Sequence, residues 1–563
     1  MKWAEAAGQF PWIQTMCERG YGDSGPVYLP RADKSTFQRL NNELAQVDFD
    51  RLDNHRMALK NSLQRRLSMD MLKPFRFKRL MQIQTLNTGL AARGKKMLET
   101  GMVAEAILAG GAATRFFKGQ NTMPKALFPI SPVAGKTFLD IFLQEAAQVA
   151  DKYGIAPPVV IMVSRVTEQQ IRHALEEHQK FGLPDECIFI LPQAHHPRLD
   201  ARARIVIQPD GSLVWYGDGH GGVFSALINT GLRVRLMATG VRTLVLHNVD
   251  NTLAKPFDVT RLGYHGHGMR LFTMTVYQRK SPEQMVGVLA KLTGSGAVEV
   301  IEYSEADPNM MAAKDKDGLL FDCGHVNTNC FNLSAITDKV PPALYTDKPI
   351  VVGDKEVRSS TFEVLNQHLT KLLKGLRVGA FAMPEFRCFL PTKTLHGNDS
   401  VETTRDFMST HALDLLRQAG VIFHGRKQTG DLSPILDKAG IKAMFPDKGL
   451  ELFDHANIYL SPVSGPKTPP FARGVIVRKK GTFILDSLQP FGEFTSGPNR
   501  KTSLSLPSPM IYAGSTIEVK KGATLIIRLY AGSVLKIPGK LVVPEGKTMK
   551  IELKQGETRT IGG

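Results

Sequence analysis

A glycine turn followed by two cations is the first feature of this chain that could carry chemistry. The apolar run at residues 106–108 stops at Gly110 and Gly111, as a buried strand does where it enters a tight turn. Backbone N–H groups can approach a phosphate closely where no Cβ intervenes. Arg115 and Lys125 follow at a spacing that lets them close over negative charge. The stretch predicts a phosphate-binding loop, although a Gly-Gly pair alone more often marks an ordinary turn.

Polar side chains also stand at the ends of three other apolar or glycine-rich segments. Gln193 ends a predicted strand and carries an amide that can both donate and accept. Gly219 and His220 precede a predicted helix, whose N-terminus favours phosphate. Asp250 follows the apolar run at residues 243–246, where a carboxylate is suited to hold Mg²⁺. Each site also has a purely structural alternative. Gln193 is then an ordinary loop residue, the glycines around His220 only start a helix, and Asp250 is a helix N-cap.

One apparent phosphate loop is rejected at this stage. Gly135, Lys136 and Thr137 look like the end of a Walker A motif and open a predicted helix. The position five residues before Gly135 is Ile130, where that motif requires glycine. The tripeptide is therefore not interpreted as a nucleotide site.

Short apolar runs alternate with helical patterns after residue 104, which positions these groups on one scaffold. Strand, helix, strand in this order predicts an α/β fold with a mainly parallel sheet and helices on both faces. Ligands bind beyond the carboxyl ends of such strands, and Gly110, Gln193 and Asp250 would all lie there. We expect this catalytic domain to span residues 101–460.

The regions before and after this domain have different residue patterns. Residues 1–100 are dominated by helix formers with apolar residues at helical spacing, which predicts an N-terminal helical region. Residues 460–471 are rich in Pro, Gly and Ser and indicate a linker. Residues 461–563 then show short β-branched runs with glycine turns about every eight residues, which favours a β-helix over a small barrel. Its exposed sheet ends make a homo-oligomer plausible.

Several strings resemble the nucleotide-sugar pyrophosphorylases, which join a nucleoside triphosphate to a sugar 1-phosphate. LAGGAATRF followed by MPKALFPI resembles L-x-G-G-x-G-T-R-x-G…P-K, with Ala113 at the third glycine and Phe117 at the last one. WYGDGHGGV resembles the W-x-P-P-G-H-G-D-V motif of UTP–glucose-1-phosphate uridylyltransferases, with Asp218 at a proline position and Gly222 at the aspartate. The strings NVDN, VIEYSE, HVNTNCFN and RCFLPTKT resemble further family segments, in the family's order.

This resemblance implies a Rossmann-like, GT-A-type nucleotidyltransferase with a mixed sheet flanked by helices. It implies that Arg115, Lys125 and Lys393 neutralise phosphate charge and that Asp250 holds Mg²⁺. It assigns nucleotide binding to Gly110, Gly111, Gln193, Gly219 and His220. Sugar contacts fall to Asn248, Gly287, Glu302, Asn327 and Asn329.

The resemblance implies a reaction between UTP and glucose 1-phosphate that yields UDP-glucose and pyrophosphate. The acetylglucosamine-1-phosphate uridylyltransferases share a V-E-Y-S-E string, and their D-G-N-G-G turn matches Asp218, Gly219, Gly221 and Gly222. An enzyme for N-acetylglucosamine 1-phosphate, or for several sugars, is therefore the alternative. A nucleotide-sugar sensor without turnover is the alternative outside enzymology.

Composition excludes other classes. The formal net charge is +18, yet no long Lys/Arg run, zinc-finger or RNP-type motif occurs, so nucleic-acid binding is not expected as the main function. Five widely spaced cysteines without a C-x-x-C pair predict a reducing cytoplasm. Apolar runs are only strand-length and no secretory signal pattern opens the chain, so neither a membrane span nor secretion is expected.

Overall fold

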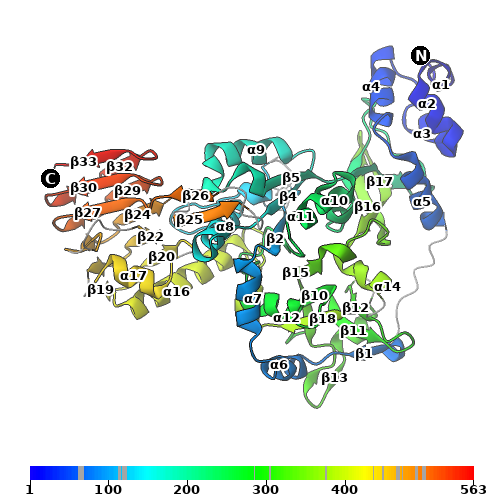
Figure 1. Ribbon diagram of the computed structural model, residues 1–563. Coiled ribbons are helices and arrows are strands. Elements are labelled where there is room, and N and C mark those ends of the chain that lie inside the picture. Colours follow the sequence, from blue (N-terminus) through cyan, green and yellow to red (C-terminus); the bar gives the residue numbers. More distant parts are fainter. Residues whose placement is uncertain are drawn as a thin grey trace.

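The computed structural model describes residues 1–562 except 61–68, 112–115, 117–122, 285, 304–305, 374–376, 435, 447–448, 464–468, 472, 488–491 and 497–502. A helix-covered β sheet lies at the centre (Figure 1). The N-terminal helices lie at one end of the molecule, and a stack of short C-terminal strands lies at the other.

A mixed sheet forms this centre. Its strands in spatial order are β1 (Leu72–Pro74), β11 (Val288–Leu292), β15 (Cys323–Asn332), β9 (Thr243–Asn248), β2 (Val103–Leu108), β4 (Val159–Val163) and β5 (Ile188–Pro192), with β10 (Phe272–Gln278), β12 (Val298–Ile301) and β18 (Val378–Ala382) paired beside them. β9, β2, β4 and β5 are parallel, whereas β15 is antiparallel to β9. The predicted mixed α/β fold is confirmed.

Helices cover both faces of the sheet because alternate residues of its strands point to opposite sides. In β2, Val103 and Ile107 pack with α8 (Phe138–Tyr153), whereas Ala104 and Ala106 pack with α10 (Gly222–Asn229) and α11 (Leu232–Ala238). The remaining helices around the sheet are α6 (Phe77–Thr85), α7 (Leu90–Glu99), α9 (Glu168–Glu177), α12 (Val259–Gly266), α13 (Pro308–Ala312), α14 (Leu369–Leu373) and α15 (Glu385–Cys388).

The helices before residue 100 lie in two separate places. A first group packs in its own core with Leu199, Ile205 and Leu213, and consists of α1 (Trp3–Gln9), α2 (Pro11–Met16), α3 (Ser24–Tyr28), α4 (Lys34–Leu44) and α5 (Phe49–Lys60). Helices α6 and α7 pack instead on the central part, where α7 contacts α12. Between the two groups, β1 joins the edge of the central sheet. The predicted N-terminal helical region thus also contributes a strand to the sheet.

Short strands between the larger elements form small separate sheets. β16 (Pro342–Val352) and β17 (Lys355–Val364) form a long hairpin whose second strand pairs with β7 (Leu199–Asp200). β6 (His195–Pro197) pairs with β8 (Trp215–Gly217), and β13 (Lys314–Asp315) pairs with β14 (Gly318–Leu319).

The C-terminal strands form three parallel sheets that the chain visits in turn. The first sheet holds β19 (Ile422–Phe423), β21 (Leu450–Leu452), β23 (Val475–Val477), β28 (Ile517–Val519) and β31 (Leu541–Val543). The second holds β20 (Thr429–Leu432), β22 (Asn457–Leu460), β24 (Thr482–Ser487), β29 (Thr524–Leu529) and β32 (Thr548–Leu553). The third holds β27 (Met510–Ala513), β30 (Val534–Ile537) and β33 (Thr558–Thr560). This repeated order is that of a β-helix, and its stacking on a second copy stays a prediction.

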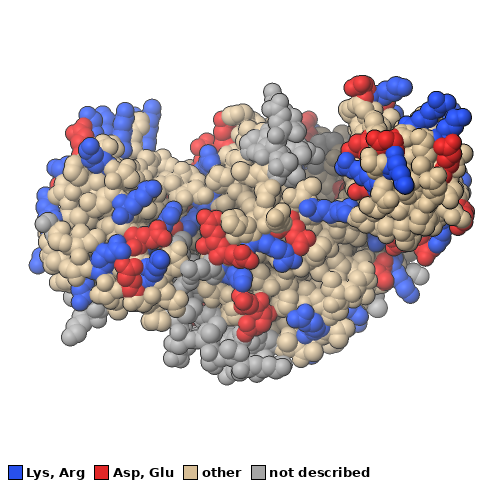
Figure 2. All heavy atoms as spheres, turned by 90° about the horizontal axis from the view of Figure 1, so that it is seen from above, with Lys and Arg blue, Asp and Glu red and all other residues tan. Residues whose placement is uncertain are grey.

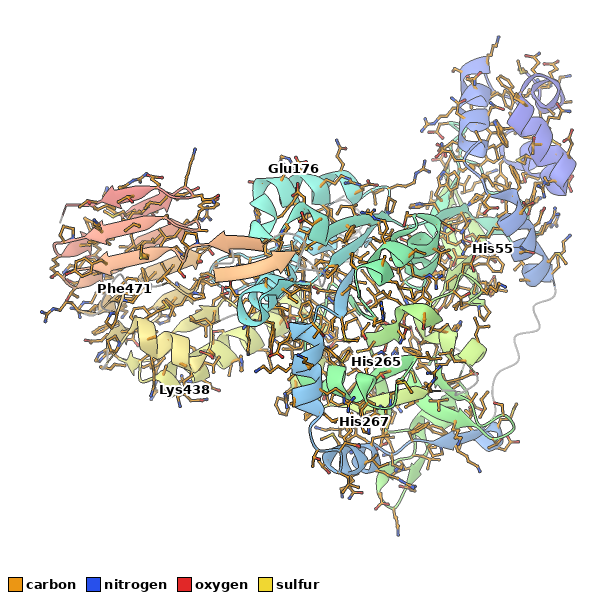
Figure 3. All side chains as sticks on the ribbon, viewed as in Figure 1. His55, Glu176, His265, His267, Lys438 and Phe471 are labelled. Carbon is orange, nitrogen blue, oxygen red and sulfur yellow. The ribbon has the colours of Figure 1, made fainter. Side chains whose placement is uncertain are left out.

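The β-helix begins before the domain boundary that the sequence suggested at residue 461. β20 pairs with β22, and β22 pairs with β24. α16 (Val401–Ala419) and α17 (Lys438–Met444) lie in the same stretch of the chain. Phe471, at the end of the predicted linker, is fully buried and stacks on Phe445 at 4.9 Å between ring centroids (Figure 3). Leu460, Val463 and Phe471, at the two ends of the predicted linker, belong to the apolar core of the β-helix, so the described ends of this segment are part of the β-helix.

The β-helix is fixed to the central part by buried polar contacts. Lys136 Nζ lies 2.7 Å from Asp486 Oδ2 of β24, and these side chains are 9% and 4% exposed. Backbone N–H groups of Val133 and Ala134 donate to Asp431 Oδ2. A hairpin of β25 (Gly492–Ser496) and β26 (Ser503–Leu506) reaches back and pairs with β3 (Ile155–Ala156). Lys136 of the rejected Walker-like tripeptide therefore joins two parts of the fold.

The surface carries charges of both signs, and the cysteines make no disulfide among the described residues. Within the described part of the chain, no helix has the length and apolarity that a bilayer span needs. Figure 2 shows Lys and Arg interspersed with Asp and Glu over much of one face, with a row of cations at the C-terminal end. All five cysteines are free, and Cys187, Cys323, Cys330 and Cys388 are buried.

We predict that Lys136→Met destabilises the protein by about 3–5 kcal/mol, because it leaves the Asp486 carboxylate buried without its cation. Thermal and urea unfolding would measure the loss. The double variant Lys136→Met/Asp486→Leu should recover most of it, since neither charge remains.

Lys95→Ala is the matched control, because its ion pair with Glu99 is exposed. It should change the free energy of unfolding by no more than about 0.5 kcal/mol. Equal losses in the Lys136 single and double variants would show that the pair is not what holds the two parts together.

Candidate active site

A cavity of about 210 Å³ opens at the carboxyl end of β9 and gathers most of the predicted site residues. The predicted residues that line it are His220, Asn248, Asp250, Gly287, Glu302, Asn327 and Lys393. They come from segments more than 170 residues apart. The other lining residues are Asn251, Val286, Tyr303, His325, Val326, Gln367, Phe389 and Pro391.

A lysine that does not itself line the cavity contacts one of the carboxylates that do. Lys125 follows the Gly110-Gly111 turn, and its backbone N–H donates to the Gly111 carbonyl at 2.9 Å. Its Nζ lies 2.5 Å from Asp250 Oδ2. The carboxyl ends of β2 and β9 are neighbours, so the loops after these two strands meet here.

Lys393 reaches the cavity from a loop that Asn251 fixes in place. The Asn251 amide donates to the Cys388 carbonyl at 2.9 Å and accepts from the Leu390 N–H at 2.8 Å. The Thr392 N–H donates to the Asp250 carbonyl at 2.9 Å. Lys393 itself is 41% exposed, and its Nζ lies 3.6 Å from Asp399 Oδ2. Its ammonium group is thus available to an anionic ligand.

A chain of side-chain amides forms the floor of the cavity. Asn327 Nδ2 donates to Asn248 Oδ1 at 2.9 Å, and Asn329 Nδ2 donates to Asn327 Oδ1 at 3.1 Å. Asn366 Nδ2 donates to Asn327 Oδ1 at 2.8 Å, and Asn366 Oδ1 accepts from Asn329 at 2.8 Å. Each amide fixes the orientation of the next, which aims the Asn248 and Asn327 side chains into the cavity.

Asn329 is a correction to the sequence-based assignment. Its side chain is fully buried, and its Oδ1 also accepts from His325 Nε2 at 3.1 Å. It does not line the cavity and supports Asn327 from below. Residues two apart in a strand lie on the same face of the sheet, so the sequence pattern places Asn327 and Asn329 together. It does not reveal that Asn329 lies deeper below the surface than Asn327.

Asn366 and Gln367 are site residues that sequence reasoning missed. Asn366 links Asn327 to His220, and Gln367 Nε2 donates to Glu302 Oε1 at 2.5 Å. Neither belongs to the strings that resemble the family motifs. The sequence signal that could have identified them is the Asn-Gln-His run directly after the apolar end of a strand.

Asn366 also sets the tautomer of His220. Its backbone N–H and its Nδ2 both donate to His220 Nδ1, at 3.2 and 2.8 Å. Burial, reinforced by His325 and His368, lowers the pKa of His220 to about 3. The ring is therefore neutral at pH 7 and carries its proton on Nε2, where it can donate to a ligand in the cavity.

Glu302 and Gly287 stand at the opposite wall. A Cβ added at Gly287 would lie 2.7 Å from Val300 Cγ1 and 3.1 Å from Glu302 Oε1. The Gly287 carbonyl accepts from the His325 N–H at 2.8 Å. Glycine is needed there because Glu302 lies directly against the backbone.

Gln193 and the glycine loops form a second group beside the cavity. Gln193 Nε2 donates to the Gly219 carbonyl at 3.1 Å, and a Cβ on Gly110 would lie 3.1 Å from Gln193 Oε1. Gly219 has φ 84°, and a Cβ there would lie 2.6 Å from the Val364 carbonyl. A Cβ on Gly221 would lie 2.7 Å from Val364 Cγ1. These two glycines are required by packing on β17, a reason that the sequence did not reveal.

The structure explains why residue 222 is glycine where the family motif has aspartate. A Cβ there would lie 1.9 Å from Asp218 Oδ1, so the carboxylate at position 218 fills the space beside residue 222. Asp218 is fully buried with Arg51 Nη2 at 3.7 Å, and burial raises its pKa to about 6. The acidic group that the family motif carries at residue 222 is here provided from residue 218.

A buried acid lies beneath Asn248. Glu105 Oε1 is 2.8 Å from His247 Nε2, and His247 Nδ1 is 3.1 Å from the Asn248 carbonyl. Because that carbonyl can only accept, Nδ1 carries the imidazole proton and Nε2 accepts. Burial, with Glu145 nearby, raises the pKa of Glu105 well above its usual value, and burial lowers the pKa of His247 to about 4. The pair is neutral, with Glu105 as the donor.

Arg115, together with Ala113 and Phe117, lies outside the described residues. Gly111 is described, and a Cβ on it would meet no atom within 4 Å. In the described part of the chain, no group of three or more His, Cys, Asp or Glu side chains is arranged to hold a metal.

Comparisons with known proteins agree with this geometry. A family model described as UTP–glucose-1-phosphate uridylyltransferase matches residues 48–385. A probable UDP-N-acetylglucosamine pyrophosphorylase of Schizosaccharomyces pombe is 26% identical over 429 residues, which cover 70% of this chain and 88% of that protein. UDP-N-acetylglucosamine diphosphorylase 1 of Arabidopsis thaliana is 26% identical over 370 residues, which cover 62% and 72%.

Solved structures share the fold. The uridine diphosphate N-acetylglucosamine pyrophosphorylase from Trypanosoma brucei has a TM-score of 0.62 at 19% identity, covering 78% of this chain and 97% of that one. A UDP-glucose phosphorylase from the same organism has a TM-score of 0.52 at 16% identity, covering 94% and 100%.

The sheet, the cavity at its carboxyl edge and these likenesses define a nucleotidyltransferase. Since the family model matches more than half of the chain, the chain belongs to the UTP–glucose-1-phosphate uridylyltransferase family. This confirms the family that the sequence motifs indicated.

We predict that Asn366→Ala lowers kcat/KM by about 10²-fold, because the amides of Asn327 and Asn329 lose a shared partner and His220 loses its orientation. Pyrophosphate release would measure the effect, with thermal unfolding as the test that the variant is folded. Asn42→Ala, on the exposed face of α4, is the matched control and should leave the kinetics unchanged. Normal kinetics in folded Asn366→Ala would remove the amide network from the site.

We also predict that Glu105→Leu is about 1–3 kcal/mol less stable than Glu105→Gln, because only glutamine keeps a donor for His247 Nε2. The raised pKa of Glu105 means that its protonation stabilises the fold fully below pH 4.5 and less as the pH rises toward its folded pKa.

Glu105→Gln removes this pH dependence. Its stability relative to the natural protein should therefore increase above pH 4.5, by at most about 1.4 kcal/mol per pH unit. Urea unfolding at several pH values would measure the difference. A constant difference would mean that Glu105 is ionised in the folded protein.

Proposed function

We propose that this protein transfers a uridylyl group from UTP to N-acetylglucosamine 1-phosphate, giving UDP-N-acetylglucosamine and pyrophosphate. The observation that carries the proposal is the single cavity that gathers Asn248, Asn327 and Glu302 beside Asp250 and Lys393. A sugar would lie against the amides while its phosphate faces the cation. The names of the relatives from Schizosaccharomyces pombe and Arabidopsis thaliana support the N-acetylated sugar.

The wall of the cavity is also suited to an acetamido group. Val286, Val326 and Phe389 supply apolar contact for a methyl group, and the amide of Asn327 stands beside them. An acetamido group needs this combination, because its methyl is apolar while its N–H and carbonyl require partners. Glucose lacks the methyl and would leave the apolar wall without a counterpart.

Glucose 1-phosphate, which the sequence motifs favoured, is kept as the second candidate. The description of the family model supports it, and the fold is shared with a UDP-glucose phosphorylase. Both sugars enter the same reaction, so the choice concerns specificity and not chemistry.

The reaction in this proposal is an in-line displacement. An oxygen of the sugar phosphate forms a bond to the α-phosphorus of UTP, and the bond from that phosphorus to the β-bridging oxygen breaks, so pyrophosphate leaves with the electron pair. No covalent enzyme intermediate is needed, and catalysis consists of positioning and charge neutralisation. Lys393 would neutralise the sugar phosphate, and Lys125 would exchange Asp250 for the phosphates of UTP.

Asp250 is the proposed ligand of a magnesium ion. Its Oδ1 has no hydrogen-bond partner within the described part of the chain, whereas Oδ2 contacts Lys125. One carboxylate fits Mg²⁺ when substrate phosphates and water complete its octahedral shell. The ion would supply positive charge that helps to neutralise the phosphates. The protein's own part is to hold Asp250 at the end of β9 and to orient it through the Lys125 contact.

The test is pyrophosphate release with UTP, Mg²⁺ and three sugar phosphates, the 1-phosphates of N-acetylglucosamine, glucose and galactose. We predict a kcat/KM at least about 10-fold higher for N-acetylglucosamine 1-phosphate, since burying an acetyl group against apolar side chains favours binding by about 1.4 kcal/mol or more. A preference for glucose 1-phosphate would establish the second candidate instead.

Variants separate the reaction from the sugar preference. Lys393→Ala should lower kcat by about 10²-fold with every sugar, because it removes a cation facing the reacting phosphates. Lys95→Ala, an exposed lysine, is the control. Binding of UTP without pyrophosphate release from any sugar would contradict the proposed reaction.

A further inference from the structure

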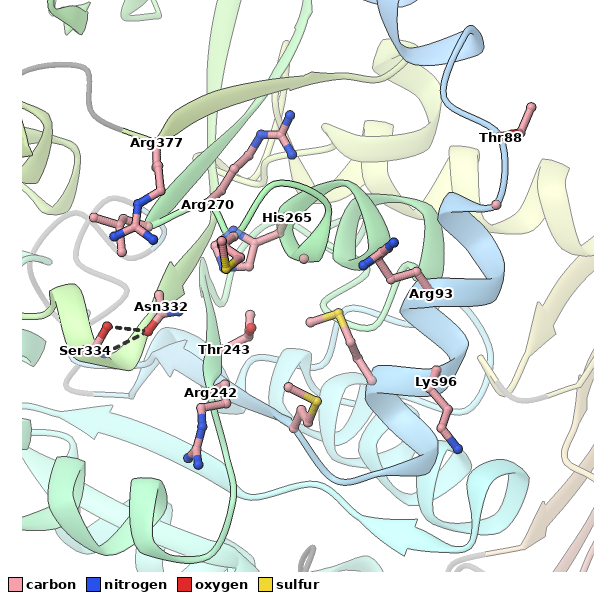
Figure 4. Close-up of a pocket in the computed structure, with 16 residues that line it drawn as sticks. Thr88, Arg93, Lys96, Arg242, Thr243, His265, Arg270, Asn332, Ser334 and Arg377 are labelled. Atoms are coloured by element: carbon pink, nitrogen blue, oxygen red, sulfur yellow. Dashed lines mark hydrogen bonds between the residues drawn. The ribbon is translucent and has the colours of Figure 1, made fainter.

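A second and larger cavity lies at the other end of β9, where the strand begins. Its volume is about 760 Å³, and α7 and α12 border it together with the first residue of β9 and the last residue of β15 (Figure 4). β9 starts at this cavity with Thr243 and ends at the candidate active site with Asn248. The length of that strand, roughly 17 Å, separates the two sites.

The charged residues that line this second cavity are all cationic. They are Arg93, Lys96, Arg242, Arg270 and Arg377. No Asp or Glu occurs among its lining residues in the described part of the chain. Glu99, the acidic residue of α7, pairs with Lys95 at 3.4 Å instead. The cavity therefore carries positive charge that the protein itself does not neutralise.

Two of these arginines are held by backbone carbonyls, which leaves their charges uncompensated. Arg242 donates to the carbonyls of Met237 and Val241, at 2.8 and 3.0 Å. Arg270 donates to the carbonyls of Tyr264 and His267 and lies 3.9 Å above the Tyr264 ring. These contacts fix the two side chains in place, so they form a preorganised rim.

The other cations have free donors. Arg93, Lys96 and Arg377 make no side-chain hydrogen bond or ion pair with any described residue. Figure 4 shows the Arg93 guanidinium directed from α7 toward the cavity, with Arg377 on the other side. Arg377 has φ 51°, a strained backbone conformation that persists in a non-glycine residue only where the surroundings impose it.

A buried histidine and an apolar floor complete the cavity. His265 is 2% exposed, and its Nδ1 lies 2.9 Å from Thr273 Oγ1. Its Nε2 has no partner among the described residues, and the ring borders the cavity (Figure 4). Burial, together with Arg270, lowers the pKa of His265 to about 3, so the ring is neutral at pH 7. Met97, Met102 and Leu271 supply the apolar surface.

We propose that this cavity is a second ligand site, which binds a small phosphorylated molecule that carries a ring. Arginine and lysine side chains without carboxylate partners recognise phosphate oxygens. The apolar floor and the neutral imidazole accommodate the ring, and the volume lies in the range of small-molecule sites. The proposal goes beyond the uridylyl transfer proposed above and does not rest on it.

Isothermal titration calorimetry on the full chain tests the proposal, with ATP and pyridoxal 5′-phosphate as probes. Adenosine and inorganic phosphate are the comparison arms. We expect saturable binding of a ring-bearing phosphate that is at least about 10-fold tighter than either arm and weakens as salt is added. The double variant Arg93→Ala/Arg377→Ala should weaken that binding about 10-fold or more.

Lys95→Ala is the matched control, because Lys95 lies on the same helix as Arg93 but pairs with Glu99. It should bind the probes as the natural protein does. Absence of saturable binding by both probes, or unchanged binding in the double variant, would overturn the proposal. Inorganic phosphate binding as tightly as the probes would overturn the role given to the apolar floor. These binding measurements do not depend on turnover, so they remain informative if the proposed reaction is wrong.

Discussion

The register between β2 and β9 is the constraint on which the candidate active site depends. Leu108 pairs with Asn248, so the loops that leave these parallel strands start at the same level. That alignment brings Lys125 within 2.5 Å of Asp250, although the two residues are 125 positions apart. A shift of one residue would turn every side chain of the strand to the other face and separate the pair. The hydrophobic layers on both faces of β2 prevent such a shift, because they fix which residues are buried on each side.

Buried polar groups beneath the site make the arrangement specific. Glu105 and His247 form a neutral pair under Asn248, and the amides of Asn327, Asn329 and Asn366 connect the floor of the cavity to His220. A buried polar group without a partner costs about 1–3 kcal/mol, so each member of the chain favours one orientation of the next. The site is therefore largely formed before a ligand enters, which reduces the free energy spent on ordering side chains during binding.

The β-helix is connected to this site through the start of α8. Lys136 and the capping residue Thr137 lie side by side, so the ion pair with Asp486 and the beginning of α8 occupy one point of the fold. α8 in turn covers the face of β2 that carries Glu105. The C-terminal part thus stabilises the central sheet by contact rather than by contributing residues to the described site.

Sequence alone determined the class of fold and most members of the site. The alternation of apolar strands and helices indicated a sheet with ligands at its carboxyl edge, and short motifs placed Asn248, Asp250, Gly287, Glu302, Asn327 and Lys393, which line one cavity. Glycine turns at regular spacing within residues 461–563 likewise indicated the β-helix. These features were readable because periodicity and glycine positions are local properties of a chain.

Only the tertiary structure decided the depth and the partners of each residue. Asn329 is buried beneath Asn327, Asn366 joins the network from a segment outside the motifs, and Gly219 and Gly221 are needed for packing on β17. Asp218 fills the space beside Gly222, and Phe471 belongs to the β-helix core. The cations of the second cavity come from helices and strand ends scattered between residues 93 and 377. Such relations arise from contacts between distant segments, which no local pattern of residues encodes.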